Sequence, residues 1–294
     1  MSTQSWLRIF SCVLVWALAS TITPFPSFAN VVVSFAFVHY LLSVRYAKNN
    51  IVRLMSTPRE AISLAAVVLC AIAASRTDMS LLLLFGVHHV CNEVYLLHRN
   101  LGAAQYGQAK LLRASALVFN FAIYLAILRR VPQIAFIDHT CLFIVLACSC
   151  VFFSMNLWKM RRVLTSPSLI DLCMLEGLGL IFLGVSFFVD IKLLHIVMYH
   201  FIFWGLNPIR SMLKQGGSRV LEYTVLNVAL AALFIVMSPL GPLPFHFSAS
   251  DYSTQFRFWS FIHIISSFAL SAAHPGWIRR WFQPRKMVLA AKTG

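Results

Sequence analysis

The stretch 81–99, LLLLFGVHHVCNEVYLLHR, decides how the rest of this sequence is interpreted. Its first half is typical of an apolar membrane-spanning helix. Two adjacent histidines then follow, with an asparagine, a glutamate and a tyrosine after them, where a lipid-facing helix would continue with leucine. Ionisable groups at that depth are costly, so they usually face the interior of a helix bundle and mark a functional site. The stretch therefore predicts a membrane helix that contributes to a polar, histidine-rich site.

The overall composition is that of a membrane protein. Of the 294 residues, 60% are hydrophobic and only 11% are charged, whereas a soluble domain is about half apolar and a quarter charged. About ten apolar runs come close to the roughly 20 residues that a span needs. They are Leu7–Ile22, Phe28–Val44, Glu60–Ala74, Met79–His98, Leu111–Leu128, Ile134–Trp158, Leu169–Val189, Ile191–Leu206, Val220–Met237 and Phe256–Ala273. The seventh and eighth are nearly continuous.

The predicted fold class is therefore all-α. We expect a polytopic integral membrane helical bundle with about nine or ten transmembrane helices. Residues 1–294 form one transmembrane domain in this interpretation, with Ser238–Gln255 as its longest outer loop. Arg8, the first apolar run and Ser27-Phe28-Ala29 would also suit a cleaved signal peptide, but the later spans favour a retained helix.

The basic residues predict the orientation of the chain. If the N-terminus is cytoplasmic and the spans alternate, most of the 24 lysines and arginines fall on the cytoplasmic side, as positive-inside proteins require. The outer side then holds Arg76, Arg129, Arg130, Lys192 and Arg257. The adjacent pair Arg129-Arg130 is the discordant feature. We expect a bacterial inner (cytoplasmic) membrane protein with a cytoplasmic C-terminus.

The net charge of +15 does not indicate nucleic-acid binding, because the basic residues form short clusters between apolar runs. The expected partner of this charge is anionic lipid at the cytoplasmic face. The basic tail at 275–294 is expected to lie at that interface. The seven cysteines all fall in apolar runs and indicate neither a disulfide framework nor a zinc motif.

Counting residues from the cytoplasmic end of each span places several polar groups at one depth. His39, Glu93, Glu176 and His200 lie about five to seven residues in, while His88, His89 and His263 lie about nine or ten in. At 1.5 Å per residue these groups occupy a band within roughly 15 Å of the cytoplasmic interface. Histidines from several helices, together with carboxylates, suit a metal such as Fe(II), Zn or Cu.

The site residues follow from this band. The predicted metal ligands are His39, His88, His89 and His200. The catalytic candidates are Glu93 and Tyr95. The secondary candidates are Asn92, Glu176, His263 and His274. His89 and Glu93, like His88 and Asn92, are four residues apart and share a helix face.

Three classes of function remain open. One is a non-haem Fe(II) oxygenase that acts on a lipophilic small-molecule substrate from the bilayer. The second is a b-type haem protein, in which His88 or His89 pairs with His200 or His263. The third is a non-enzymatic carrier or structural protein that uses the histidine and glutamate band as a proton relay or for packing. The histidine boxes of membrane desaturases, HxxxH and HxxHH, are absent from the sequence.

His88 with Glu93 five residues on, the Tyr199-His200 region before Arg210, and Ala273-His274-Pro275 carry a family resemblance. In these features the chain resembles the bacteriorhodopsin-related-protein-like (Brp/Blh-type) β-carotene dioxygenases. It lacks that family's proline–histidine–glycine stretch. The resemblance implies a membrane iron enzyme, in which histidines from different helices hold one iron that activates oxygen to cleave a carotenoid-like polyene.

Overall fold

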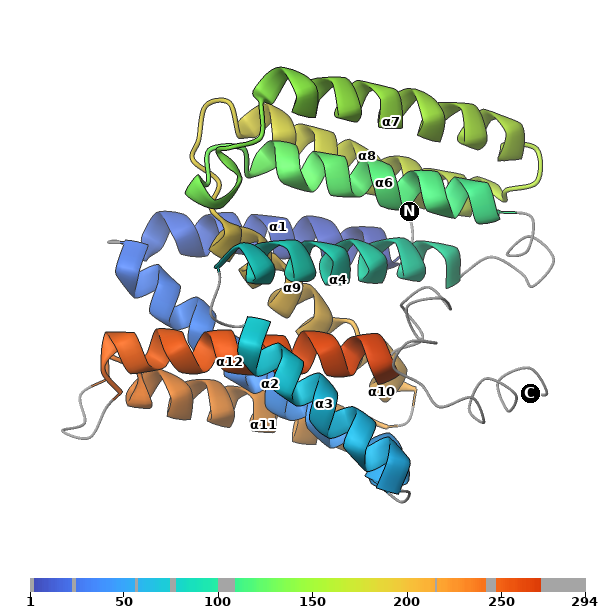
Figure 1. Ribbon diagram of the computed structural model, residues 1–294. Helices are drawn as coiled ribbons and strands as arrows, with labels where there is room; N and C mark the ends of the chain where they lie inside the picture. The colour runs from blue at the N-terminus through green and yellow to red at the C-terminus, as the bar shows by residue number, and fades with distance from the viewer. Residues whose placement is uncertain are drawn as a thin grey trace. The chain divides into compact units, whose positions relative to one another are not determined.

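The computed structural model describes residues 3–22, 25–55, 58–74, 78–99, 109–214, 216–241 and 247–270, and it is helical with no β-strand over these residues (Figure 1). The α-helices are α1 (Thr3–Thr21), α2 (Phe25–Met55), α3 (Pro58–Ala74), α4 (Asp78–Arg99), α6 (Lys110–Ile127), α7 (His139–Met160), α8 (Ser166–Val185), α9 (Leu193–Leu206), α10 (Ile209–Leu213), α11 (Gly217–Met237) and α12 (Ala249–Leu270). A short 3-10 helix, η1 (Pro132–Ile134), precedes α7. The all-α class is confirmed.

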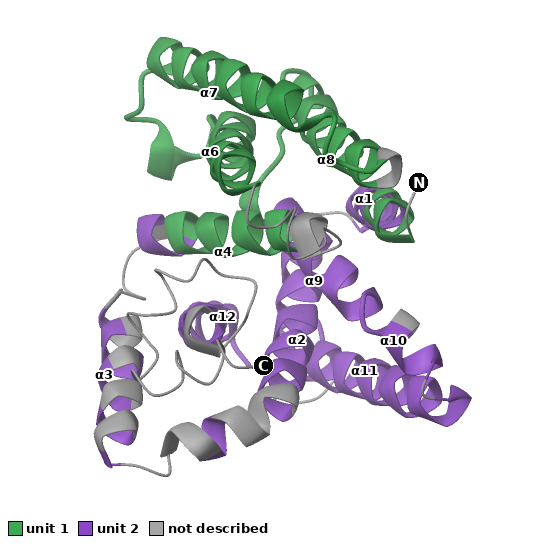
Figure 2. Cartoon of the chain, turned by 90° about the vertical axis from the view of Figure 1, so that its right-hand side faces the viewer, with its two compact units in different colours: residues 1–9, 82–193, 272–275 green, residues 10–81, 194–271, 276–294 purple. Residues whose placement is uncertain are grey.

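The helices belong to two compact units (Figure 2). Unit 1 comprises residues 1–9, 82–193 and 272–275, and unit 2 comprises residues 10–81, 194–271 and 276–294. In unit 1, α6 packs against α7 and α8. In unit 2, α2 packs against α3, α11 and α12. The expectation of a single domain stays a prediction.

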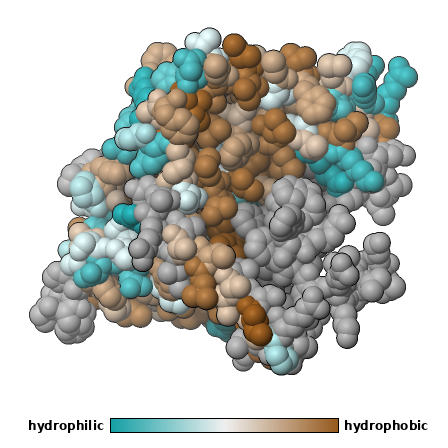
Figure 3. All heavy atoms as spheres, in the orientation of Figure 1, coloured by the Kyte–Doolittle hydropathy of each residue, from teal (hydrophilic) through white to brown (hydrophobic). Residues whose placement is uncertain are grey.

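Five helices among the described residues are long and apolar enough to cross a membrane. The candidate spans are Phe25–Arg45, Lys110–Ile127, His139–Met160, Ser168–Val185 and Gly217–Met237. Large apolar side chains on α7, such as Val151 and Trp158, are exposed. Figure 3 shows that hydrophobic side chains cover the middle of the surface around α7, while hydrophilic residues gather toward its ends. These helices are consistent with an integral membrane protein.

Two helices extend beyond the apolar runs that predicted them. The run in α2 ends at Val44, but the helix continues to Met55 because no glycine or proline interrupts it before Pro58. The outer loop expected over Ser238–Gln255 is wrong in its second part, since α12 begins at Ala249. Ser248 Oγ accepts the Asp251 N–H at 3.2 Å, as a helix N-cap does. Both α2 and α12 therefore include polar residues next to the apolar segment, which a search for apolar runs does not detect.

Other predicted runs end at capped boundaries. The run Ile134–Trp158 divides, because Ile134 belongs to η1 while α7 begins at His139. Asp138 caps α7 by accepting the Cys141 N–H at 2.9 Å. The seventh and eighth runs are separate helices, since α8 ends at Val185 and α9 begins at Leu193.

Arg129 and Arg130, the discordant pair of the predicted orientation, have a structural role. Arg129 Nη1 donates to Ser186 Oγ at 2.6 Å, and its Nη2 donates to the Ser186 carbonyl at 3.0 Å. Arg130 Nη2 donates to the Phe187 carbonyl at 3.1 Å. The carbonyls at the end of a helix lack partners within the helix, so these two side chains satisfy the end of α8. Their position therefore follows from helix capping.

Gly86 allows α4 and α6 to approach closely within unit 1. A Cβ at position 86 would lie 2.5 Å from Tyr124 Cε1 and 3.0 Å from Phe121 Cε2. The Tyr124 hydroxyl also donates to the Leu82 carbonyl at 2.9 Å, so the ring is held in place. We expect Gly86→Ala to lower the free energy of unfolding by about 1–3 kcal/mol, because the ring must move. Thermal unfolding in detergent measures this loss, and Gly177→Ala, where a Cβ meets nothing within 4 Å, is the matched control.

Candidate metal centre

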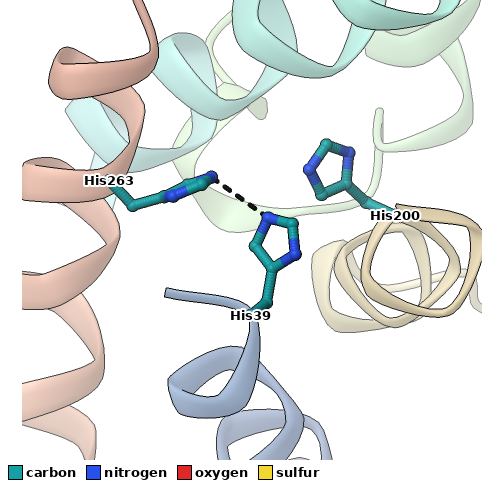
Figure 4. A group of neighbouring side chains, drawn as sticks. All are labelled: His39, His200 and His263. Atoms are coloured by element: carbon teal, nitrogen blue, oxygen red, sulfur yellow. Dashed lines mark hydrogen bonds between the residues drawn. The ribbon is translucent and has the colours of Figure 1, made fainter. Parts of the chain in front are cut away.

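Three histidines from three helices converge in unit 2 (Figure 4). His39 comes from α2, His200 from α9 and His263 from α12. Each offers one ring nitrogen, and these atoms all lie within 4.8 Å of one another. His39 Nε2 and His263 Nε2 are 3.2 Å apart. Among the described residues, this is the group of histidine, cysteine or carboxylate side chains that could hold a metal ion.

Hydrogen bonds between α2 and α12 fix two of these histidines relative to each other. The Ser34 Oγ lies 2.8 Å from the Tyr252 hydroxyl. Further along both helices, the Tyr40 hydroxyl lies 2.6 Å from Ser260 Oγ. Because both partners advance along the chain together, α2 and α12 run parallel at this contact. His263 follows Ser260 by one turn and so lies beside His39.

Aromatic rings surround the three histidines. The Tyr40 ring stacks on His263, with centroids 5.1 Å apart and an interplanar angle of 29°. The Phe201 ring lies 5.1 Å from His39. His200 is 1% exposed, and the Trp204 ring lies 6.2 Å from it. Such a shell restricts the rotation of the imidazoles, although His39 and His263 are only partly buried.

One of the three nitrogen separations, that between His39 and His263, fits a mononuclear transition-metal site. A metal–imidazole bond is about 2.0–2.1 Å long, so two neighbouring ligand nitrogens on one metal lie about 3.0–3.4 Å apart. The 3.2 Å between His39 and His263 falls in this range. His200, whose ligand nitrogen lies within 4.8 Å of the other two, would supply a third imidazole, the ligand type that suits iron, zinc and copper. A metal held by these three side chains would remain open to water, oxygen or a substrate.

The same spacing does not fit a haem held by His39 and His263. The two axial nitrogens of a haem lie about 4 Å apart on opposite faces of the macrocycle, since each bond to iron is about 2 Å. The two nitrogens at 3.2 Å leave no room for a porphyrin between them. The haem pairs expected from the sequence, which join His88 or His89 to His200 or His263, stay predictions.

The predicted ligands His88 and His89 lie on α4 in unit 1. Asn92 Nδ2 donates to His88 Nε2 at 3.1 Å, so the predicted pairing on one helix face exists. His89 stacks on Phe85 with centroids 5.8 Å apart and rings nearly parallel. Two of the four predicted ligands, His39 and His200, lie together in the structure. The third member of their group is His263, which was a secondary candidate.

The catalytic candidate Glu93 belongs to a buried ion pair. Arg8 Nε donates to Glu93 Oε2 at 2.7 Å, and Arg8 Nη2 lies 3.5 Å from the Glu93 carbonyl oxygen. The two side chains are 1% and 4% exposed. Sequence reasoning treated Arg8 as a cytoplasmic charge or part of a signal peptide and missed this partner. Its position five residues into α1 is the signal that could have identified a buried arginine.

Of the remaining candidates, Tyr95 and Glu176 belong to the part of the chain that the structure describes, and His274 does not. Tyr95 is partly buried on α4. Glu176, on α8, is buried and accepts a hydrogen bond from Asn120 at 2.8 Å. His274 and the basic tail at 275–294 lie outside the described residues, so their predicted roles stay predictions.

Tyr40 is a positioning residue for His263 that the sequence did not single out. Tyr40→Phe keeps the ring that stacks on His263 but loses the bond to Ser260, so we expect metal stoichiometry to be unchanged. Tyr40→Leu removes the ring and frees the imidazole, and we expect metal affinity to fall about 10-fold. Competition with a chelator of known affinity measures both variants. Equal affinity in Tyr40→Leu and the unmodified protein would contradict this role.

Comparisons of the chain with protein-family models, with curated proteins and with solved structures found no match. The candidate function of the centre therefore rests on its own geometry: three imidazole nitrogens from three helices, held by hydrogen bonds and aromatic rings within unit 2.

Proposed function

We propose that this chain is an integral membrane metalloenzyme, a non-haem iron oxygenase that acts on a lipophilic, carotenoid- or lipid-like small molecule. The observation that supports the proposal is the convergence of His39, His200 and His263 with their ligand nitrogens within 4.8 Å. The proposal includes about nine or ten membrane spans in a bacterial inner membrane, with the C-terminus in the cytoplasm.

The protein would contribute three imidazoles and the aromatic side chains around them. Neutral imidazole binds divalent metals through the lone pair of one nitrogen, and the other nitrogen fixes the ring by its own contacts. An Fe(II) ion held by His39, His200 and His263 would supply the activation of oxygen. Phe201 packs beside His39 and Tyr40 beside His263, and these rings would reduce the access of water to the imidazoles.

The setting favours an apolar substrate. Helix α2, which carries His39, is one of the candidate membrane spans. The residues packed around the histidines are aromatic, namely Tyr40, Phe201 and Trp204. Trp204 Nε1 is buried and has no hydrogen-bond partner among the described residues, so it is a donor available to a bound polar group. A lipophilic molecule with a small polar end suits these surroundings.

Metal content and a visible spectrum of the detergent-purified protein test the proposal. We expect about one iron per chain and no Soret band. A Soret band would contradict the proposal and would support a b-type haem protein instead. Protein that holds no transition metal after purification and after anaerobic incubation with Fe(II) would contradict it, and would favour a carrier or a structural role for the histidines.

A further inference from the structure

Glu176 lies in the apolar interior of unit 1 with one carboxylate oxygen unsatisfied. It belongs to α8, whose residues Ser168–Val185 are a candidate membrane span. The residue is 5% exposed. Its Oε1 accepts a hydrogen bond from Asn120 Nδ2 at 2.8 Å. Its Oε2 is buried and has no hydrogen-bond partner among the described residues.

Asn120 has no second hydrogen to offer to Oε2. Its Nδ2 donates to the Ala116 carbonyl at 2.8 Å as well as to Glu176. A side-chain amide has two N–H bonds, and both are used here. The two acceptors also fix the orientation of the amide, because an oxygen at that position would face two other oxygens. Asn120 therefore holds one carboxylate oxygen of Glu176 and leaves the other without a donor.

The charge balance around Glu176 disfavours a second buried anion. Arg8, on α1, is the charged group that acts electrostatically on Glu176. Arg8 already forms the 2.7 Å ion pair with Glu93 on α4. His89, which is also on α4, interacts electrostatically with both members of this pair. Since Glu93 already compensates the charge of Arg8, ionisation of Glu176 would add a net negative charge to the apolar interior.

A proton fits this position better than a metal cation. Sodium, magnesium and calcium ions need about six oxygen ligands, and a lone carboxyl beside the N–H₂ end of an amide does not provide them. A proton on Oε2 neutralises the carboxyl and removes the cost of burying a charge.

We propose that unit 1 contains a proton-binding site at Glu176, whose carboxyl carries an exchangeable proton beside the Arg8–Glu93 ion pair. This site is independent of the histidine centre in unit 2 and of the proposed oxygenase function. It gives the membrane interior of unit 1 a group that can accept and release protons, the element from which a proton pathway is built.

Modification by dicyclohexylcarbodiimide tests the site in the full-length protein in detergent. The reagent reacts with protonated carboxyls in apolar surroundings: the acid proton moves to a carbodiimide nitrogen, and the carboxyl oxygen adds to the central carbon. The acyl group then migrates from oxygen to nitrogen, leaving a stable N-acylurea. We expect peptide mass spectrometry to find this adduct on Glu176 at mildly acidic pH and to find less of it at alkaline pH.

Two controls make the result decisive. Glu176→Gln should lose the adduct, and Glu222, an exposed carboxyl paired with Arg45, should react instead with a water-soluble carbodiimide. Glutamine mimics a protonated glutamate, so Glu176→Gln should unfold at the same temperature as the unmodified protein. Glu93→Gln, which removes the partner of Arg8, should unfold at a clearly lower temperature. An unmodified Glu176, or a loss of stability in Glu176→Gln as large as in Glu93→Gln, would overturn the proposal.

Discussion

Alanine at any one of positions 39, 200 or 263 is expected to abolish stoichiometric metal binding. Each substitution leaves two imidazoles, and a site with two protein donors holds a divalent metal far more weakly than a site with three. We expect the metal content to fall from about one per chain to less than a tenth of that value after dialysis against a weak chelator. Inductively coupled plasma mass spectrometry of each purified variant measures this loss directly.

His195→Ala is the matched control for these variants. His195 lies on α9, the same helix as His200, but its ring packs against Phe28 with centroids 5.2 Å apart. It does not belong to the group formed by His39, His200 and His263. The control should therefore keep its full metal content. Full metal content in the alanine variants at positions 39, 200 and 263 would contradict the centre.

The same measurement tests the ligands that the sequence favoured in unit 1. The geometry of unit 2 provides a complete set of three donors without His88 and His89. We therefore expect His88→Ala and His89→Ala to retain the metal. Loss of metal in either of them would add that histidine to the ligand set and support the sequence-based assignment.

The sequence predicts a common depth for the histidines, but it does not predict which helices are neighbours. Charges in the loops predict the direction of each span, and from it that His39, His200 and His263 lie on the same side of the membrane. Such a count is one-dimensional and does not say which helices are adjacent. The contact of α2 with α12 depends on hydrogen bonds such as Ser34 to Tyr252, which join residues 218 positions apart in the chain.

His88 was a predicted ligand and His263 only a secondary candidate, because His88 is followed by an asparagine one turn later on the same helix. His88 has a polar neighbour one turn away, and the structure shows that Asn92 satisfies it within the same helix. His263 also has a polar residue one turn away, Ser266, whose hydroxyl donates to the His263 carbonyl. The His263 ring lies 3.2 Å from the His39 ring on another helix. Spacing within one helix therefore did not indicate this contact between helices.

The ends of the helices were predicted less well than their centres, because different interactions determine the two. Apolar content reports contact with lipid or core, so it located each helix. The ends depend on caps and on polar helical turns, as at Ser248 before α12 and in the extension of α2 to Met55. Arg129 and Arg130 show the same effect, since they satisfy helix ends on the side where loop statistics expect few basic residues.

The second large effect is expected at the Arg8–Glu93 ion pair of unit 1. Both side chains are almost fully buried, and Arg8 Nε lies 2.7 Å from Glu93 Oε2. Removing one partner leaves an uncompensated charge in an apolar interior, which costs about 3–5 kcal/mol. We expect Arg8→Met and Glu93→Leu each to lower the free energy of unfolding by that amount. Denaturant titration of the protein in mixed micelles measures it.

The double variant separates the charge effect from the loss of packing. When both partners are replaced by apolar side chains of similar volume, no buried charge remains, and such replacements are often neutral or stabilising. Arg8→Met combined with Glu93→Leu should therefore be markedly more stable than either single variant. The exposed pair Arg45–Glu222, also 2.7 Å long, is the control, since breaking an exposed pair costs at most about 1 kcal/mol. If the double variant were less stable than both single variants, packing rather than charge would account for the effect, and the ion pair would not be what joins α1 to α4.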